Sequence, residues 1–291
     1  MSYVGFSKIK KSPIQGTHFD NELNGDDILE ADNLFGFIQA AGYLKYIMAT
    51  EYNVGLAYRG QNKIYPSMLA SLYHETKTVK ARQAKNRLFN ELIKNIKLEI
   101  TENTTIRQKN ASIEGYLSVQ EKFLPAILQH YGIQTPWLDL VDNLWVALWF
   151  ACHKAIRQGQ YTRYEKRIDT QNDFCYIVFV RIPIAQDEKI PYLFIDKNSE
   201  VVDLRNNLPS LFLRPHAQHG LILHNLNKNA WDMSDLVEAT IRIKLSNALK
   251  WLGEGELLST GGLFPSPVYD LGMQKLLRIN CIKDYLEIPT P

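Results

Sequence analysis

The sequence has few cysteines and no long apolar run, and both absences limit what the protein can be. Its three cysteines, Cys152, Cys175 and Cys281, are odd in number and far apart, so they indicate neither a disulfide framework nor a zinc site. No window reaches the roughly 18 apolar residues that a membrane span needs, and residues 1–27 lack the apolar core of a signal peptide. We therefore predict a cytoplasmic protein with reduced cysteines and no membrane contact.

An excess of either charge is also missing, as are the usual phosphate loops. The 33 basic and 31 acidic residues leave a formal net charge of +2, so nucleic acid is not an expected partner. Gly253–Gly255 and Gly261–Gly262 lack the strand, glycine and helix order of a dinucleotide-binding fingerprint. His216, His219 and His224 lie close in sequence, but no cysteine or acid accompanies them, so no metal site is predicted.

The residues that are present indicate an α+β fold. Apolar residues at helical spacing dominate the first half of the chain, and short apolar or alternating runs dominate the second. We predict a helix-rich first half packed on a mixed, mainly antiparallel sheet. The expected helices are residues 33–50, 80–100, 126–131 and 246–252, one starting near residue 142, and a last one at 269–279. The expected strands are residues 54–61, 175–180, 192–195, 200–204, 221–224 and 236–243, and residues 157–173 are expected to be a charged loop.

Residues 1–31 are polar and show no sustained period. We predict that they form an arm over the surface, where a protein partner could bind. Asp32 is expected to cap the first helix, and residues 32–291 are expected to form a single domain.

The stretch from Leu128 to His153 concentrates polar residues between apolar ones. A glycine and a threonine-proline turn separate the end of one helix from Asp139, and a tryptophan-rich helix follows. We expect a polar loop held between two buried helices. Such a loop is typical of a binding or catalytic site, and it is equally typical of a helix corner without chemistry.

An arginine at the end of an apolar strand is the second candidate feature. Residues 54–58 are apolar and lead into Arg59, Gly60 and Gln61. The guanidinium fork can bind two oxygens of a phosphate or carboxylate, and glycine allows the ligand to approach the backbone. The alternative is an ordinary strand end. A third polar segment, from Arg214 to Gly220, leads into the predicted strand at residues 221–224.

These three segments resemble the FRG domain family. Tyr58–Gln61 resembles its (F/Y)-R-G-Q motif, Gln129–Asp139 with the helix that follows resembles its Q-H-Y-G-x-P-T-R-L-L-D segment, and Ala217–Leu221 is similar to its third element. The likeness spans residues 54–276 and implies one FRG-like domain. Gln134 and Trp137 stand where the family has proline and arginine, so the ligand of this chain would differ or depend on Arg59 alone.

The order of these motifs is similar to that of arginine-type ADP-ribosyltransferases, which implies an NAD-like ligand. On this fold-level analogy Arg59 would hold the pyrophosphate, Thr135 or His130 would bind the ribose, and Tyr131 or Trp137 would stack on the nicotinamide. The other ligand-binding candidates within or beside the motifs are Tyr58, Gln61, Gln129, Arg214 and Gln218.

The analogy also requires a catalytic acid, which the third motif does not supply. Gln218 cannot supply the negative charge that an oxocarbenium-like transition state needs. Asp139 is the candidate acid, with His130 beside it in the motif, and Glu238 on the later strand is the fallback.

Three hypotheses follow. The pocket binds or senses a nucleotide or another phosphorylated small molecule without turnover. Alternatively, it belongs to an NAD-consuming enzyme, an ADP-ribosyltransferase or NAD glycohydrolase. A role of such an enzyme as a toxin or defence effector is implied by the resemblance alone. In the third hypothesis the chain is an interaction scaffold, Asp139 caps the tryptophan-rich helix, and Arg59 and Asp139 form a core ion pair.

Overall fold

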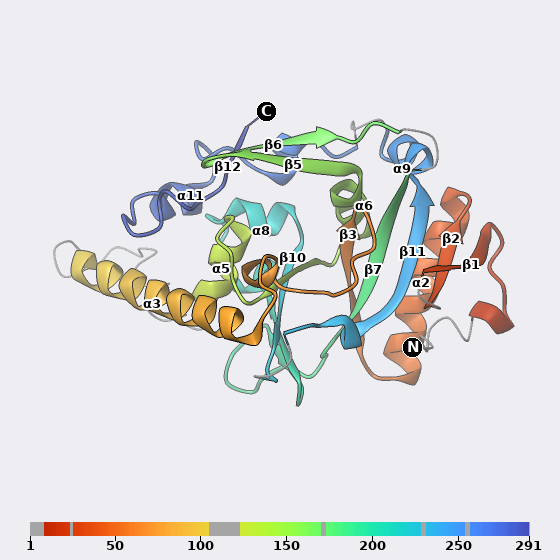
Figure 1. Ribbon diagram of the computed structural model, residues 1–291, viewed down its shortest axis with the longest axis horizontal. Helices are drawn as coiled ribbons and strands as arrows, with labels where there is room; N and C mark the ends of the chain where they lie inside the picture. Colours follow the sequence, from red (N-terminus) through yellow and green to blue (C-terminus); the bar gives the residue numbers. More distant parts are fainter. Residues whose placement is uncertain are drawn as a thin grey trace.

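The computed structural model describes residues 9–23, 26–104, 123–169, 173–227, 231–253 and 257–290. Helices cover a large mixed sheet, so the predicted α+β class is confirmed (Figure 1). Among the described residues, no helix is long and apolar enough to cross a membrane.

Nine strands form the main sheet, in the order β1-β2-β11-β7-β3-β4-β10-β9-β8. Only the pairing of β2 with β11 is parallel within the described sheet, so it is mainly antiparallel, as predicted. The strands are β1 (Thr17–Leu23), β2 (Asp26–Ala31), β3 (Gly55–Gln61), β4 (Leu138–Val141), β7 (Phe174–Ile182), β8 (Leu193–Ile195), β9 (Ser199–Asp203), β10 (Gly220–Asn225) and β11 (Val237–Lys244).

The N-terminal residues differ from the arm that the sequence predicted. Residues 1–8 lie outside the described residues, but β1 and β2 form a hairpin that extends the sheet beyond β11. Leu29 of β2 is fully buried against the core, while Arg242 of β11 pairs with Glu30. Strand β1 is the edge of the sheet, and β2 adds only a short buried run, Ile28–Ala31. This run is too short to give a sustained apolar period, which explains why the sequence pattern did not reveal these strands.

Helix α2 (Leu34–Glu51) follows this hairpin and packs on the sheet beside β3 and β2 (Figure 1). Its N-cap is Asn33, not the predicted Asp32, because the Asn33 side chain accepts a hydrogen bond from the backbone N–H of Gly36.

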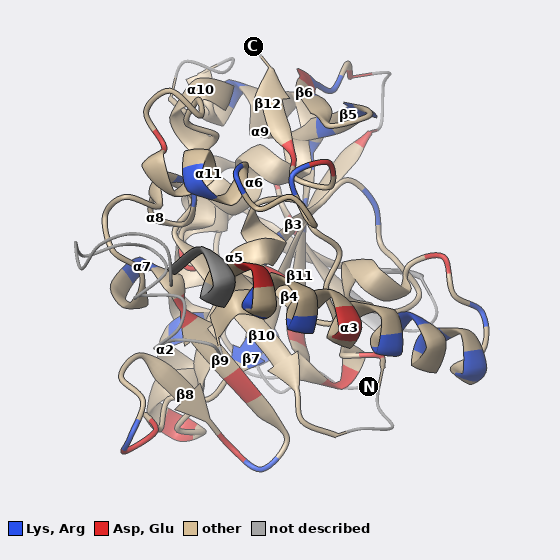
Figure 2. Ribbon diagram, turned by 90° about the vertical axis from the view of Figure 1, so that its left-hand side faces the viewer, with Lys and Arg blue, Asp and Glu red and all other residues tan. Residues whose placement is uncertain are grey.

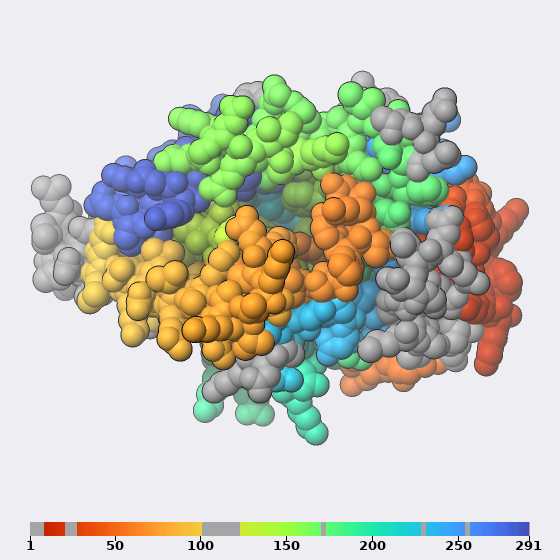
Figure 3. Space-filling view, in the orientation of Figure 1, coloured from red at the N-terminus to blue at the C-terminus, as the bar shows by residue number. Residues whose placement is uncertain are grey.

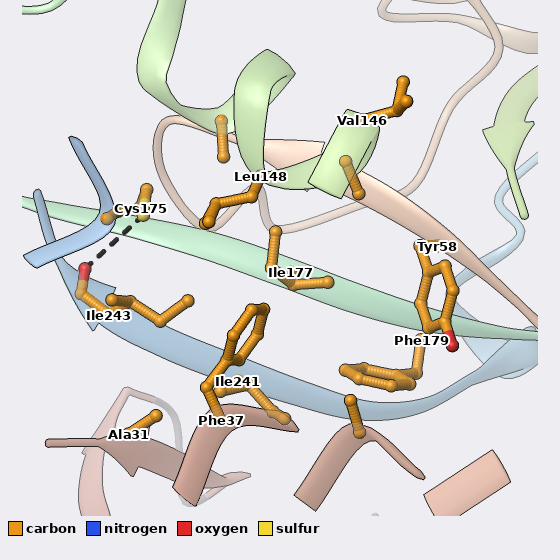
Figure 4. Packing of buried hydrophobic residues seen from close by; sticks show 14 of the residues in the cluster. Ala31, Phe37, Tyr58, Val146, Leu148, Cys175, Ile177, Phe179, Ile241 and Ile243 are labelled. Carbon is orange, nitrogen blue, oxygen red and sulfur yellow. Dashed lines mark hydrogen bonds between the residues drawn. The ribbon is translucent and has the colours of Figure 1, made fainter. Parts of the chain in front are cut away.

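Alternation along β7 divides the core into two faces. Cys175, Ile177 and Phe179 point into a first core with α2 and with α6 (Leu144–Cys152), and Val178 and Val180 point to the opposite face. Figure 4 shows the first core, where the Cys175 thiol donates to the carbonyl oxygen of Ile243 at 3.5 Å. Helix α6 is buried on nearly all sides, as its composition predicted.

A second core lies under the other end of the sheet. It joins α3 (Val79–Thr104), α5 (Leu124–His130) and α11 (Leu271–Leu276) to β9 and β10. Leu88 shares the helical spacing of the buried Ile96 and Ile100, but its side chain is 65% exposed and Phe89 is buried instead. Both signs of charge occur along the exposed side of α3 (Figure 2).

Residues 153–166 form a hairpin, not the charged loop that the sequence predicted from residue 157. Strand β5 (His153–Gln158) pairs with β6 (Tyr161–Lys166), and β12 (Ile288–Thr290) adds to β6 in parallel. This hairpin is mostly exposed, so it carries charged side chains despite its strand backbone. The remaining short helices are η1 (Ser71–Tyr73), α7 (Leu204–Asn207), α8 (Leu213–Ala217), η3 (Ser234–Leu236), α9 (Leu245–Trp251) and α10 (Thr260–Leu263).

Candidate ligand-binding site

A cavity of about 280 Å³ lies where β3 and β4 separate, between the two cores. The two strands pair only at Tyr58 and Val141. The cavity brings together residues from all three motifs that the sequence singled out: Tyr58, Arg59, Gly60, Gln129, His130, Asp139 and Gln218. Figure 3 shows the surface hollowed between the green β5–β6 hairpin and the orange residues that follow β3.

Arg59 spans the opening between the two strands. Its Nη1 donates to the backbone carbonyl oxygen of Asp139 at 2.7 Å. This side-chain bond takes the place of a backbone hydrogen bond between β3 and β4. Burial lowers the pKa of Arg59, and the nearby Asp139 charge opposes this effect. Within the described part of the chain the guanidinium forms no ion pair with a carboxylate, and Arg59 lines the cavity.

Gly60 has a packing reason to be glycine. A Cβ atom at this position would overlap the backbone carbonyl oxygen of Ala147 in α6. The absent side chain allows β3 and α6 to approach closely, which brings Phe150 of α6 to the cavity wall beside Arg59.

Gln129 fixes the turn and the acid of the second motif. Its Oε1 accepts hydrogen bonds from the Thr135 hydroxyl at 2.6 Å and the Thr135 backbone N–H at 3.2 Å. Its Nε2 donates to Asp139 Oδ2 at 2.7 Å. The expected polar loop is therefore a turn held by these hydrogen bonds. It continues into β4, so Asp139 lies on a strand of the sheet.

His130 connects the second motif to the third. Its Nδ1 lies 3.2 Å from Gln218 Oε1, and its ring packs on Gly220, where a Cβ atom would overlap the imidazole. Burial lowers the pKa of His130, an effect that the nearby Arg214 reinforces, while Asp139 and the bond from Gln218 oppose it. The glycine of the third motif thus leaves room for the histidine of the second.

A buried ionic network forms the rear wall. Arg214 is 1% exposed, and it donates to the carbonyl oxygens of His130 and Glu287, each at 2.9 Å. Its Nη1 lies 3.5 Å from the Glu287 carboxylate, which also accepts a 2.7 Å hydrogen bond from the Tyr164 hydroxyl. Burial and the adjacent Glu287 charge raise the pKa of Tyr164. The C-terminal residues are therefore part of the site.

Aromatic rings line the other end of the cavity. Tyr164 stacks on Phe264 with 4.1 Å between ring centroids, and Phe150 meets Phe264 edge to face. His153 stacks on Trp149 at 3.9 Å and bonds to its carbonyl oxygen. The cavity wall thus combines polar side chains, Arg59 and Asp139 among them, with aromatic rings.

A second cavity of about 680 Å³ adjoins the first. The two share Arg59, Gly60, Phe150, His153 and Ala155 in their walls. Gln61 lines only the second cavity. Arg59 therefore lies at the junction between the two cavities.

Five predicted site residues lie outside both cavities. Tyr131 is buried and donates to Asp270, Thr135 is buried in the turn, and Arg214 lies behind the wall. Trp137 stacks on His224 with 4.6 Å between centroids, on another side of the chain. Glu238 forms an ion pair with Arg181. The predicted stacking by Tyr131 or Trp137, ribose contact by Thr135 and catalysis by Glu238 find no support from these positions.

Sequence reasoning did not propose four residues that line the cavity: His153, Tyr164, Phe264 and Glu287. Three of them lie beyond the second motif, on the hairpin and in the C-terminal part of the chain. Two weak signals existed, because Phe264 lies within the span that resembles the FRG family and His153 directly follows the motif helix. No local signal points to Tyr164 or Glu287.

One group of possible metal ligands occurs among the described residues. His18, Glu30 and Asp32 have ligand atoms within 4.8 Å of one another at the edge formed by β1 and β2. Arg242 already pairs with the Glu30 carboxylate at 2.6 Å. The positive charge of Arg242 weakens the attraction of this carboxylate for a metal cation. This group lies outside the two cavities.

We expect the protein to lose stability as the pH falls from about 6.5 to 5, the range just below the ordinary histidine pKa. Burial lowers the folded-state pKa of His130 and of His153, so unfolding takes up protons in this range. The stabilising effect is present above the unfolded-state pKa and is lost as the pH falls toward the folded-state value. Thermal melts of wild type and His130→Gln across this range should show a smaller pH slope for the variant. Equal slopes would assign the effect to other groups.

Comparison with known proteins supports part of the sequence interpretation. The model of the FRG domain family matches residues 55–160, so this part of the chain is similar to an FRG domain. The match includes Arg59, Gln129, His130 and Asp139 and ends before Gln218 and Glu287, which complete the cavity. No curated protein and no solved structure matches the chain.

Proposed function

We propose that the FRG-containing chain binds a nucleotide or a similar phosphorylated small molecule, NAD among them, in the cavity at Arg59. The observation that carries this proposal is the placement of the half-buried Arg59 guanidinium at the junction of two cavities. A phosphate or pyrophosphate at the junction would accept bonds from the guanidinium fork, while the rest of the ligand extends to either side.

The wall of the first cavity offers groups that suit both parts of a nucleotide. Phe150, Tyr164 and Phe264 offer ring faces and edges to a base or a nicotinamide, and Asp139 and His130 offer acceptors to a sugar. The volume of about 280 Å³ lies just below the range of about 300–1,000 Å³ that is typical of ligand sites, and the adjoining cavity of about 680 Å³ extends it. A dinucleotide would occupy both.

An NAD-consuming enzyme, an ADP-ribosyltransferase or NAD glycohydrolase, is the second candidate. Asp139 favours it, because a carboxylate in the cavity could stabilise positive charge on a ribose. Two features favour binding without turnover. Glu238 lies outside the cavities, and the second acid of the wall, Glu287, is engaged by Arg214 and Tyr164.

The scaffold hypothesis loses one of its supports. It required a core ion pair between Arg59 and Asp139, but the guanidinium donates to the backbone oxygen of Asp139, and Gln129 holds the carboxylate. A guanidinium engaged only through one backbone contact is costly to bury for packing alone.

Incubation of the purified protein with NAD, ADP-ribose and AMP tests the proposal. We expect a ligand-dependent rise in melting temperature without release of free nicotinamide from NAD. Nicotinamide release by wild type that is lost in Asp139→Asn would favour the enzyme. No melting shift and no release with any of the three would overturn the proposed function.

A further inference from the structure

Two buried hydrogen-bond acceptors, on His130 and Asp139, face each other in the cavity wall. His130 Nε2 and Asp139 Oδ1 lie 3.7 Å apart, and the His130 side chain is 3% exposed. Neither atom has a hydrogen-bond partner among the residues that the structure describes. Buried polar atoms are normally satisfied, so an unpartnered pair in a cavity wall points to a ligand.

The surrounding bonds determine that His130 Nε2 is an acceptor. Gln218 Nε2 donates to the carbonyl oxygen of Leu263 at 2.9 Å, so Gln218 must present its Oε1 to His130 Nδ1. Nδ1 therefore carries the ring hydrogen. Burial lowers the pKa of His130, so the ring is neutral at neutral pH and Nε2 keeps its lone pair.

Asp139 is held so that its second oxygen faces this nitrogen. Its Oδ2 accepts from Gln129 Nε2, and the Gln129 amide cannot turn because Thr135 donates twice to its Oε1. The acceptor pair is thus built from α5 and β4, each braced by a side-chain network. Two acceptors at this distance repel unless donors lie between them or beside them.

We propose that this pair binds two adjacent sugar hydroxyls, the ribose 2′ and 3′ hydroxyls of the nucleotide whose phosphate Arg59 holds. This inference rests on the proposed function and specifies the ligand as a ribonucleotide. One hydroxyl donates to His130 Nε2 and its neighbour donates to Asp139 Oδ1. An ammonium group fits less well, because the cationic Arg59 and Arg214 both lie near the pair.

Titration calorimetry with AMP, 2′-deoxy-AMP and 2′,3′-dideoxy-AMP tests the inference. We expect affinity to fall at least about tenfold for each missing hydroxyl, since each loss leaves a buried acceptor unsatisfied. Equal affinity for the three nucleotides would overturn the inference and leave the proposed function standing. No binding of AMP, ADP-ribose or NAD would overturn both.

Asp139→Asn supplies an independent readout. The side-chain amide introduced by this substitution would donate to His130 Nε2 and close the pair internally, so the variant should melt no lower than wild type and bind AMP and dideoxy-AMP alike. The matched control is Asp142→Asn, because Asp142 pairs with Lys45 and Arg205 outside the cavity. This control should keep the wild-type preference for AMP. A preference retained in Asp139→Asn would contradict the inference.

Discussion

Replacing Arg59 with alanine is expected to weaken NAD binding on the order of 100-fold or more. Removing one member of a buried charged hydrogen-bonded pair costs about 2–5 kcal/mol, and each 1.4 kcal/mol is a factor of ten in the dissociation constant. Arg59 is the cation that lines both cavities and forms no ion pair with a carboxylate in the described part of the chain. Titration calorimetry with NAD measures the change directly.

Two further variants separate the role of the fork from the role of the charge. Arg59→Lys keeps the charge but cannot bind two phosphate oxygens in the same plane, so we expect it to recover only part of the affinity. Arg87→Ala removes an exposed arginine of α3, away from both cavities, and should bind NAD like wild type. Wild-type affinity in Arg59→Ala would remove the basis of the proposed function.

Replacing Arg214 with methionine is expected to destabilise the protein by about 3–5 kcal/mol, the usual cost of breaking a buried ion pair from one side. The substitution leaves the Glu287 carboxylate without its cation and removes the donors to the carbonyl oxygens of His130 and Glu287. Urea unfolding measures the change in the free energy of unfolding.

The double variant Arg214→Met with Glu287→Gln tests whether the lost stability comes from the unpaired charge of Glu287 or from lost packing. Removing the negative charge should recover part of the lost stability, while the amide oxygen of the introduced glutamine still accepts from Tyr164. The matched control is Arg181→Met, because the partly exposed pair of Arg181 with Glu238 should cost less than about 1 kcal/mol. A double variant no more stable than Arg214→Met, or an unaffected single variant, would show that this network does not stabilise the fold.

The two motif glycines could be recognised in the sequence, but their structural role could not. Gly60 and Gly220 are visible in the sequence as parts of motifs, and nothing there says what they contact. In the fold Gly60 admits the backbone of α6, and Gly220 admits the ring of His130. Both glycines therefore bring two motifs together, and neither was expected to do so from turn chemistry.

Several elements follow from local order in the sequence. The stretch that became α2 and the apolar run that became β7 show their periodicity or composition within the segment itself, so their type and approximate limits were predicted correctly. The same holds for the strand that carries Arg59 and for the buried tryptophan-rich helix α6. Arg59, Gln129, His130, Asp139 and Gln218 were singled out from the motifs alone, and they line one cavity.

Tertiary structure alone decided the rest of the site. Strands β4 and β2 pair with strands that are distant in the sequence, so their own residues do not mark them as strands. The exposed β5–β6 hairpin shows no apolar alternation, so no local period marks it either. Glu287 reaches the cavity because β12 pairs with β6, which is a contact between residues more than 120 positions apart. The sequence by itself identified several of the polar side chains that line the cavity, and only long-range strand pairing determined which side chains share its wall.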